Sequence, residues 1–179
     1  MTILVKNNAV RTVGVAIAIP DPWGEELQER RAAYGDALAW TIPTHVTLLP
    51  PTQVPGQRID AVDRHLAEVA RYAEGFVMEL GGVASFRPVT PTVYLTLQKG
   101  AEECVRLADQ TRSGPLRRRL PFPYHPHVTL AFDVPDEQLD RAVAENDTVS
   151  MSFAVAHFTR YELGPDGVWL PERDFALAT

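Results

Sequence analysis

The chain reads IPTHVTLLPP at residues 42–51 and YHPHVTLAF at residues 124–132, so the tetrapeptide His-Val-Thr-Leu occurs twice between prolines. Alternate side chains of a β-strand share a face, so the histidine and threonine of each copy point the same way while valine and leucine face the core. Two such strands side by side would place two imidazoles around one small anionic centre. We therefore predict a site with His45 and His127 as acid and base, a pairing that suits a phosphodiester.

The residues around the two motifs predict one order of elements twice: strand, helix, His-Val-Thr strand, helix, strand. In the first round, apolar alternation and helical spacing predict a strand at 13–19, a helix at 21–40, a helix at 59–69 and a strand at 76–86. In the second round they predict a strand at 93–98, a helix at 101–112, a helix at 136–146 and one long strand at 149–163.

This repetition predicts an internal duplication and an α+β fold. We expect a single bilobal domain over 1–179, with pseudo-repeats at roughly 10–87 and 90–162 and a C-terminal hairpin at 163–179. Two antiparallel β-sheets related by a pseudo-twofold axis would line a central cleft, with the helices outside. Both motif histidines would then face that cleft.

Composition describes an ordinary globular protein of 179 residues, with 45% hydrophobic and 22% charged residues. The net charge of −6 argues against broad, sequence-independent binding of nucleic acid, which needs many cations. No apolar run is long enough to span a membrane, and the start MTILVKNNAVRTVG lacks the features of a signal peptide. We expect a cytoplasmic protein with no membrane association and no stable protein partner.

The paired H-x-T motifs resemble those of the two-histidine phosphoesterase superfamily, and within it the 2′-5′ RNA ligase-like branch that includes RNA 2′,3′-cyclic phosphodiesterases. The segment FPYHPHVTLAF at 122–132 is similar to the approach to that family's second motif. The segment TRYELGPDGVWLPERDFAL at 159–177 is similar to its closing strand and hairpin. The resemblance implies a bilobal α+β fold, a metal-independent site and hydrolysis or transfer at cyclic or 2′-5′ phosphodiesters.

Carried over to this chain, the resemblance implies that His45 donates a proton to the leaving oxygen and His127 accepts one from the attacking water. The near-symmetry of the two motifs leaves the direction open. Thr47 and Thr129 would donate to the nonbridging oxygens as charge develops. The expected substrate is an RNA end or a nucleotide, and no cofactor or metal is expected.

One position departs from the family. Many similar cyclic phosphodiesterases carry an arginine a few residues after the second H-x-T, where this chain has Phe132. Arg118, within the run 117–119, is the candidate replacement, although a run of charge is often only a solvated face. Tyr94 could stack on a base or ribose, or could simply line the interface between lobes.

Two alternative functions remain open, whereas a metal site and ATP-driven ligation are not expected. His125 and His127 form H-x-H, but two ligands fall short of a usual metal site, so we expect no metal there. The enzyme could act on another small cyclic phosphate, or the domain could be a catalytically inactive module that binds nucleotides or RNA ends. ATP-driven ligation is not expected, since the chain has no Gly-rich loop ending in Lys-Ser or Lys-Thr.

Overall fold

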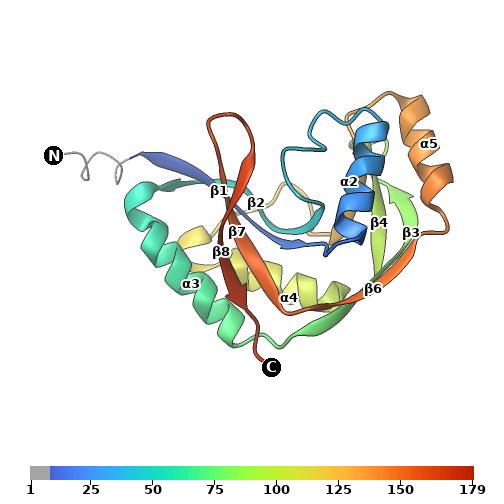
Figure 1. The fold of residues 1–179 in the computed structure, drawn as a ribbon. Helices are drawn as coiled ribbons and strands as arrows, with labels where there is room; N and C mark the ends of the chain where they lie inside the picture. The colour runs from blue at the N-terminus through green and yellow to red at the C-terminus, as the bar shows by residue number, and fades with distance from the viewer. Residues whose placement is uncertain (1–8) are drawn as a thin grey trace.

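The protein is built on one curled antiparallel sheet of eight strands in the order β6-β3-β4-β5-β2-β1-β7-β8 (Figure 1). The structure, a computed structural model, describes residues 9–179. Residues 1–8, on which the expected lack of a signal peptide partly depends, lie outside the described range. The strands are β1 (Val10–Ala18), β2 (His45–Pro55), β3 (Phe76–Ser85), β4 (Thr92–Lys99), β5 (His127–Phe132), β6 (Ser150–Val155), β7 (His157–Leu163) and β8 (Trp169–Ala176).

The sheet consists of two four-stranded halves that meet where the two motif strands touch. β2 pairs with β5 through one residue pair, Val46 with Val128, and these are the equivalent valines of the two motifs. The strand order is symmetric about this pair. The predicted α+β class, the antiparallel strands and the outer helices are confirmed, and the two expected sheets are the two halves of one sheet.

The last strand of each predicted repeat lies in the other half of the sheet. β3 pairs with β4, and β7 pairs with β1. The predicted long strand at 149–163 is wrong in one respect, because it breaks at Ala156 into β6 and β7. The break has a topological cause: β6 pairs with β3 in one half and β7 with β1 in the other. The division into repeats 10–87 and 90–162 stays a prediction.

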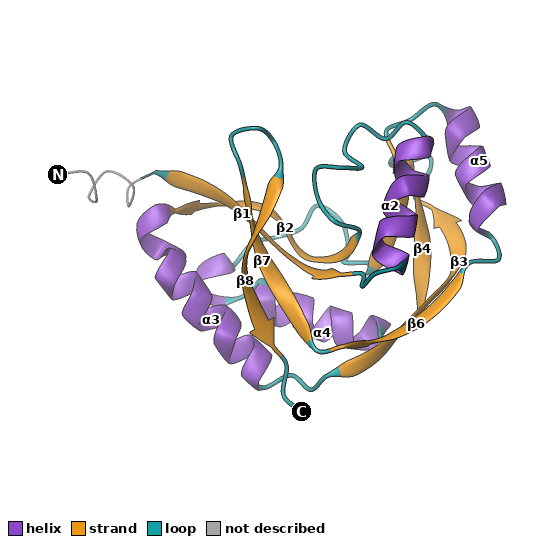
Figure 2. Cartoon of the chain, viewed as in Figure 1, coloured by secondary structure: helices purple, strands orange, loops and turns teal. Residues whose placement is uncertain are grey.

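Four α-helices and two short 3-10 turns connect the strands (Figure 2). The helices are α2 (Trp23–Ala33), α3 (Ile59–Arg71), α4 (Ala101–Thr111) and α5 (Asp136–Asn146), and the turns are η1 (Gly56–Arg58) and η2 (Gly114–Leu116). The predicted helix at 21–40 is therefore too long. It ends early because Gly35 takes a positive φ of 86°, the left-handed conformation that commonly ends a helix.

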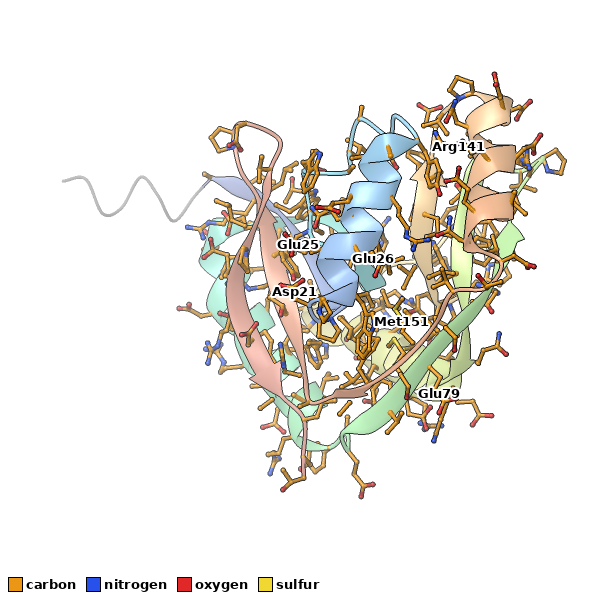
Figure 3. The ribbon with its side chains drawn as sticks, turned by 45° about the vertical axis from the view of Figure 1, so that its right-hand side comes forward. Asp21, Glu25, Glu26, Glu79, Arg141 and Met151 are labelled. Atoms are coloured by element: carbon orange, nitrogen blue, oxygen red, sulfur yellow. The ribbon has the colours of Figure 1, made fainter. Side chains whose placement is uncertain are left out.

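The helices cover the outer face of the sheet in two pairs. α3 and α4 contact each other and pack on β8 and β2, whereas α2 and α5 pack on β5. The predicted helix at 59–69 is confirmed as α3, and its residues Val62 and Leu66 are fully buried against the sheet. Asp21, Glu25 and Glu26 lie at the N-terminal end of α2, where the helix dipole favours negative charge (Figure 3). Within residues 9–179, no helix is long and apolar enough to cross a membrane.

The closing hairpin joins β7 to β8 at the free edge of the first half. Its turn includes Gly167, whose φ of 81° is the conformation that an Asp-Gly turn requires. β8 places Trp169 against the inner face of the sheet, beside the cleft described next.

Candidate active site

A cleft of about 1000 Å³ opens on the inner face of the sheet and is lined by residues of both motifs. This volume is at the upper end of the usual range for small-ligand sites. His45, Thr47, His127 and Thr129 all line it, so the structure brings together the four residues that the motifs predicted. Much of the remaining wall is apolar or aromatic, and includes Leu38, Leu49, Phe86, Phe122, Phe132, Leu163 and Trp169.

Each motif histidine is oriented by a backbone carbonyl two residues earlier in the chain. His45 Nδ1 lies 2.8 Å from the oxygen of Pro43, and His127 Nδ1 lies 2.7 Å from the oxygen of His125. A carbonyl oxygen only accepts hydrogen bonds, so Nδ1 must carry the hydrogen in both rings. The second ring nitrogen, Nε2, is therefore the one that can accept or deliver a proton at the cleft.

The sheet register explains why the two motifs share one site. In an antiparallel pair, the residues that flank a matched pair lie opposite each other on one face. With Val46 opposite Val128, that register puts His45 across from Thr129 and Thr47 across from His127. The matched valines therefore bring the histidines and threonines of both motifs to one stretch of the inner face.

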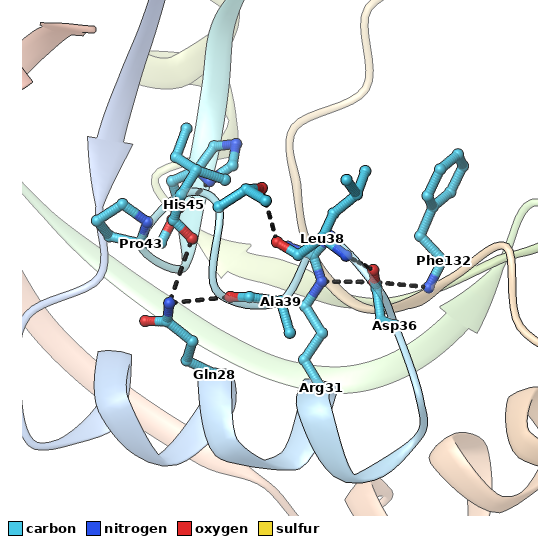
Figure 4. Close-up of polar contacts among 10 residues, drawn as sticks. Gln28, Arg31, Asp36, Leu38, Ala39, Pro43, His45 and Phe132 are labelled. Carbon is cyan, nitrogen blue, oxygen red and sulfur yellow. Dashed lines mark hydrogen bonds and ion pairs between the residues drawn. The ribbon is translucent and has the colours of Figure 1, made fainter. Parts of the chain in front are cut away.

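The loop before β2 is fixed to α2, and this sets the position of His45 (Figure 4). Gln28 Nε2 donates to the carbonyl oxygens of Ala39 at 2.9 Å and Ile42 at 3.4 Å. The Thr44 hydroxyl donates to the carbonyl oxygen of Gly24 at 3.0 Å. These bonds hold a loop without regular structure against a helix, so the strand that carries the first motif begins at a defined place.

The environment of His45 strongly favours the neutral imidazole. Thr47 Oγ1 donates to His45 Nε2 at 3.1 Å. Burial lowers the pKa of His45 to about 4, and the charges of Arg31 and His127 act in the same direction. The bond to Pro43 opposes this shift but does not cancel it. His45 is therefore uncharged near neutral pH when the cleft is empty.

The imidazole of His127 packs against two aromatic rings. The ring centroid of Phe86 lies 5.0 Å from that of His127, edge to face, and that of Tyr94 lies at 5.2 Å. Burial lowers the pKa of His127, and the charge of His125 adds to the effect. Tyr94 is only 6% exposed and stacks on Phe86 at 4.1 Å, so Phe86 is the ring that faces the cleft.

Arg118 lies beside the cleft rather than within it. Its Nη1 donates to the Pro51 carbonyl oxygen at 2.7 Å and to Thr52 Oγ1 at 2.8 Å. Of these residues Pro51 lines the cleft, whereas none of the arginines at 117–119 does so in the described part of the chain. A contact between Arg118 and substrate stays a prediction. It would need a substrate long enough to reach from the two motif histidines out of the cleft to Thr52, which Arg118 bonds.

The sequence reasoning missed a buried ion pair at the cleft. Arg31 Nε donates to Asp36 Oδ2 at 2.6 Å, with both side chains more than nine-tenths buried. Asp36 also accepts bonds from the backbone N–H groups of Leu38 at 2.9 Å and Phe132 at 3.1 Å (Figure 4). Arg31 stands in the charged run 25–31 of an outer helix, and no pattern in that run distinguishes a buried arginine from its solvated neighbours.

Within residues 9–179, no group of three or more histidine, cysteine or carboxylate side chains is placed to hold a metal ion. Among the described residues that line the cleft, the imidazoles of His45, His127 and His125 can transfer protons, and hydroxyl and guanidinium groups can donate hydrogen bonds.

Comparison with known proteins gives a consistent result. The model of the 2′-5′ RNA ligase superfamily matches residues 19–166. A Bacillus licheniformis protein provisionally named a phosphoesterase is 31% identical over 97 residues, covering 54% of this chain and 57% of that protein. A Halalkalibacterium halodurans protein of the same name is 26% identical over 126 residues, covering 70% and 72%. The match thus spans little more than half the length of the first relative.

Solved structures match nearly the whole chain. LigT of Escherichia coli in its apo form superposes with a TM-score of 0.66 at 21% identity, over 96% of this chain and 99% of LigT. Its complex with 3′-AMP gives 0.67 over 96% and 100%. A Thermus thermophilus protein gives 0.65 at 22% identity, over 93% and 97%. At such identities these structures establish the fold.

Proposed function

Because the chain belongs to the 2′-5′ RNA ligase superfamily, we propose that this phosphoesterase hydrolyses the 2′,3′-cyclic phosphate of an RNA end or a nucleotide. The proposed mechanism is acid–base catalysis by His45 and His127 without a metal. The supporting observation is that one cleft holds both imidazoles, each with Nδ1 bonded to a carbonyl, so that Nε2 is the nitrogen that can exchange a proton; in His45 this nitrogen also accepts from Thr47.

In the proposed reaction His127 takes a proton from water as the water oxygen attacks phosphorus. The bond from phosphorus to one ribose oxygen breaks, and His45 gives that oxygen a proton, leaving a phosphomonoester. Thr47 and Thr129 donate to the nonbridging oxygens as their charge grows. Water supplies the new oxygen on phosphorus, and exchange with solvent removes the proton from His127 and returns one to His45 before the next turnover.

The lowered pKa of His45 adds a condition to this scheme. A proton donor must be charged when the leaving oxygen departs, whereas His45 is neutral in the empty cleft. The negative charge of a bound phosphodiester opposes the effects of burial and of Arg31, and so raises the pKa of His45. We expect proton uptake by His45 to accompany substrate binding.

The walls of the cleft support a nucleotide-sized substrate. Phe86, Phe132 and Trp169 offer aromatic surface that can stack on a base. LigT of Escherichia coli, which shares the fold, has been crystallised with 3′-AMP. The net charge of −6 disfavours a long polynucleotide, so recognition is proposed to involve the terminal nucleotide.

A second candidate is hydrolysis of another small cyclic phosphate that carries an apolar substituent. The observation that favours it is the composition of the wall, where Leu38, Leu49 and Phe122 add aliphatic and aromatic surface beyond what one base needs. The same two histidines would act on this substrate. A module that binds nucleotides or RNA ends without turnover is the remaining alternative.

The test is an assay of purified protein, in the presence of a chelator, against a nucleoside 2′,3′-cyclic phosphate and a short RNA that ends in one. The products are resolved into 2′- and 3′-phosphates. His45→Ala/His127→Ala is the loss-of-function control. His157→Ala is the matched control, because His157 is exposed on β7.

Turnover that survives the chelator, persists in His157→Ala and disappears in the double variant supports the proposal. Binding of a nucleotide without turnover of either substrate contradicts it and favours the binding module. Activity that the chelator removes and one added ion restores contradicts the metal-independent mechanism.

A further inference from the structure

We propose that Arg31 binds the nonbridging oxygens of the substrate phosphate and that Asp36 holds its guanidinium in place for this contact. The inference rests on the proposed function, since it assigns a role at the same site. It adds a binding residue that comes from helix α2, outside both His-Val-Thr-Leu motifs.

Arg31 is the one lysine or arginine among the residues of 9–179 that line the cleft. A phosphodiester carries a full negative charge, and both motif histidines have lowered pKa values that leave them neutral in the empty site. An anion that enters an apolar cleft loses hydration, and a nearby fixed cation compensates for that loss. Arg31 is the described cleft residue that provides such a charge before substrate arrives.

The Arg31 guanidinium keeps N–H groups that do not bond to Asp36. Arg31 carries five N–H donors, and the one hydrogen bond found from its side chain to residues 9–179 joins Nε to Asp36. The four N–H groups on its two Nη nitrogens are therefore left for a ligand. Two parallel N–H groups match two phosphate oxygens well, and such charge-assisted pairs are stronger than neutral hydrogen bonds.

Asp36 is placed to fix this donor set. Its Oδ2 accepts from Arg31 Nε at 2.6 Å and from the Phe132 N–H at 3.1 Å, and its Oδ1 accepts from the Leu38 N–H at 2.9 Å. The side chain of Asp36 is 1% exposed. Three bonds in a buried position fix the carboxylate, and the carboxylate in turn fixes the arginine. Asp36 is thus a positioning residue, and it links the loop after α2 to the end of β5.

Arg31 is also close enough to His45 to influence its protonation. Its charge contributes to the low pKa of that imidazole, after the larger effect of burial. A cation that both attracts the phosphate and opposes protonation of His45 has a measurable consequence. Its removal should weaken phosphate binding and raise the pKa of His45 toward the ordinary value, whereas a residue with only a structural role would change neither.

The first experiment measures binding of inorganic phosphate by titration calorimetry at fixed salt and pH. The variant is Arg31→Gln/Asp36→Asn, which removes both charges together and so leaves no unpaired carboxylate in the interior. The control is Arg30→Gln, because Arg30 is the neighbouring arginine of the same helix and bonds Asn146 at 3.0 Å outside the cleft. Circular dichroism checks that each variant is folded.

We expect the double variant to bind phosphate roughly 10-fold or more weakly, which corresponds to a loss of at least about 1.4 kcal/mol of binding free energy. We expect kcat/KM on the cyclic phosphate to fall by about 10²-fold. The control should match wild type in both. Phosphate affinity in the double variant equal to that of Arg30→Gln would overturn the proposal.

A second measurement uses the unmodified protein, so it does not depend on the folding of a variant. Nuclear magnetic resonance of ¹⁵N-labelled arginine side chains follows the Nε and Nη signals during a phosphate titration. We expect the Arg31 signals to move along the calorimetric binding curve and those of Arg30 to stay in place. Saturation with phosphate without movement of the Arg31 signals would overturn the contact.

These binding readouts need no turnover. If wild type hydrolyses no cyclic phosphate but binds phosphate through Arg31, the proposed enzymatic function fails and the binding role of Arg31 stands. If wild type turns over and the double variant keeps full kcat/KM, the proposed function stands and the role of Arg31 fails.

Discussion

The two His-Val-Thr-Leu strands hold their imidazoles in the same way but surround them differently. Both histidines donate Nδ1–H to the carbonyl two residues earlier. Beside the first motif stands the Arg31 guanidinium, whereas the second motif is backed by the rings of Phe86 and Tyr94. The reactive group is the same in the two halves, and the neighbours differ in charge and polarity.

The difference originates in the strands next to the motifs. The residue paired with Thr47 on β1 is Ala16, and the residue paired with Thr129 on β4 is Tyr94. A methyl group leaves room beside the first motif, and a phenol ring fills the same place beside the second. An acid and a base need different proton affinities, and unlike surroundings are how one fold provides them.

The largest effect should come from removal of either imidazole. His45→Ala and His127→Ala should each lower kcat by roughly 10²-fold or more, because each removes one of the two proton-transfer groups. Steady-state assays of the two variants beside His157→Ala measure this. Near-full activity in one variant would show that only one half of the site is catalytic.

The next effect concerns the two hydroxyls. Thr47→Val and Thr129→Val keep the shape of the side chain and remove one donor each, so each should lower kcat/KM by about 10- to 100-fold. Thr47→Val should cost more, because Thr47 also bonds His45 Nε2 at 3.1 Å. Equal losses in the two variants would argue that this bond has no catalytic consequence.

A smaller effect should appear in the pH dependence of the free energy of unfolding, through His45 of the first motif. The pKa of His45 is about 4 in the folded protein and near its ordinary value when unfolded. Between these values the unfolded chain binds a proton that the folded chain does not. The contribution of neutral His45 to the free energy of unfolding is therefore fully present when the pH is above the ordinary pKa of histidine. It is lost as the pH falls from that value toward 4.

Urea unfolding at pH 7 and pH 5 measures this loss for wild type, His45→Asn and His157→Ala. The asparagine amide can still donate to the Pro43 carbonyl but does not titrate. His45→Asn should therefore lose less stability between the two pH values than wild type, and His157→Ala should behave as wild type. An undiminished loss in His45→Asn would assign the acid sensitivity to other groups.

The smallest effect should come from the aromatic support of the second motif. Phe86→Leu removes the edge-to-face contact with His127, and such contacts contribute about 0.5–1.5 kcal/mol. If that energy orients His127 for catalysis, kcat/KM should fall by about 2- to 10-fold. Unchanged kinetics would mean that the carbonyl bond to Nδ1 alone sets the ring orientation.

Patterns with a clear period predicted most of the fold. Helical spacing predicted α3 at 59–69 and α5 at 136–146. The strands were predicted by alternation, and the duplicated motif predicted that His45 and His127 share one cleft. These features depend on neighbours in the sequence, so the sequence displays them directly.

The features that the sequence did not predict depend on contacts between distant residues. The strand break at Ala156 follows from the different pairing partners of β6 and β7, which lie far away in the sequence. The cleft cation was sought at Arg118, because a run of arginines near the second motif was visible. Arg31 lies far from both motifs in sequence and reaches the cleft only because α2 packs on β5.

The exchange of terminal strands has a consequence for synthesis of the protein on the ribosome. β1 is among the first elements made, yet Gly14 pairs with Tyr161 of β7, near the end of the chain. β3 likewise pairs with β6, which is made much later. During translation the edges of β1 and β3 therefore stay unpaired until β6 and β7 have been made. Long-range pairing of this kind slows folding and leaves strand edges open to aggregation while the chain is incomplete.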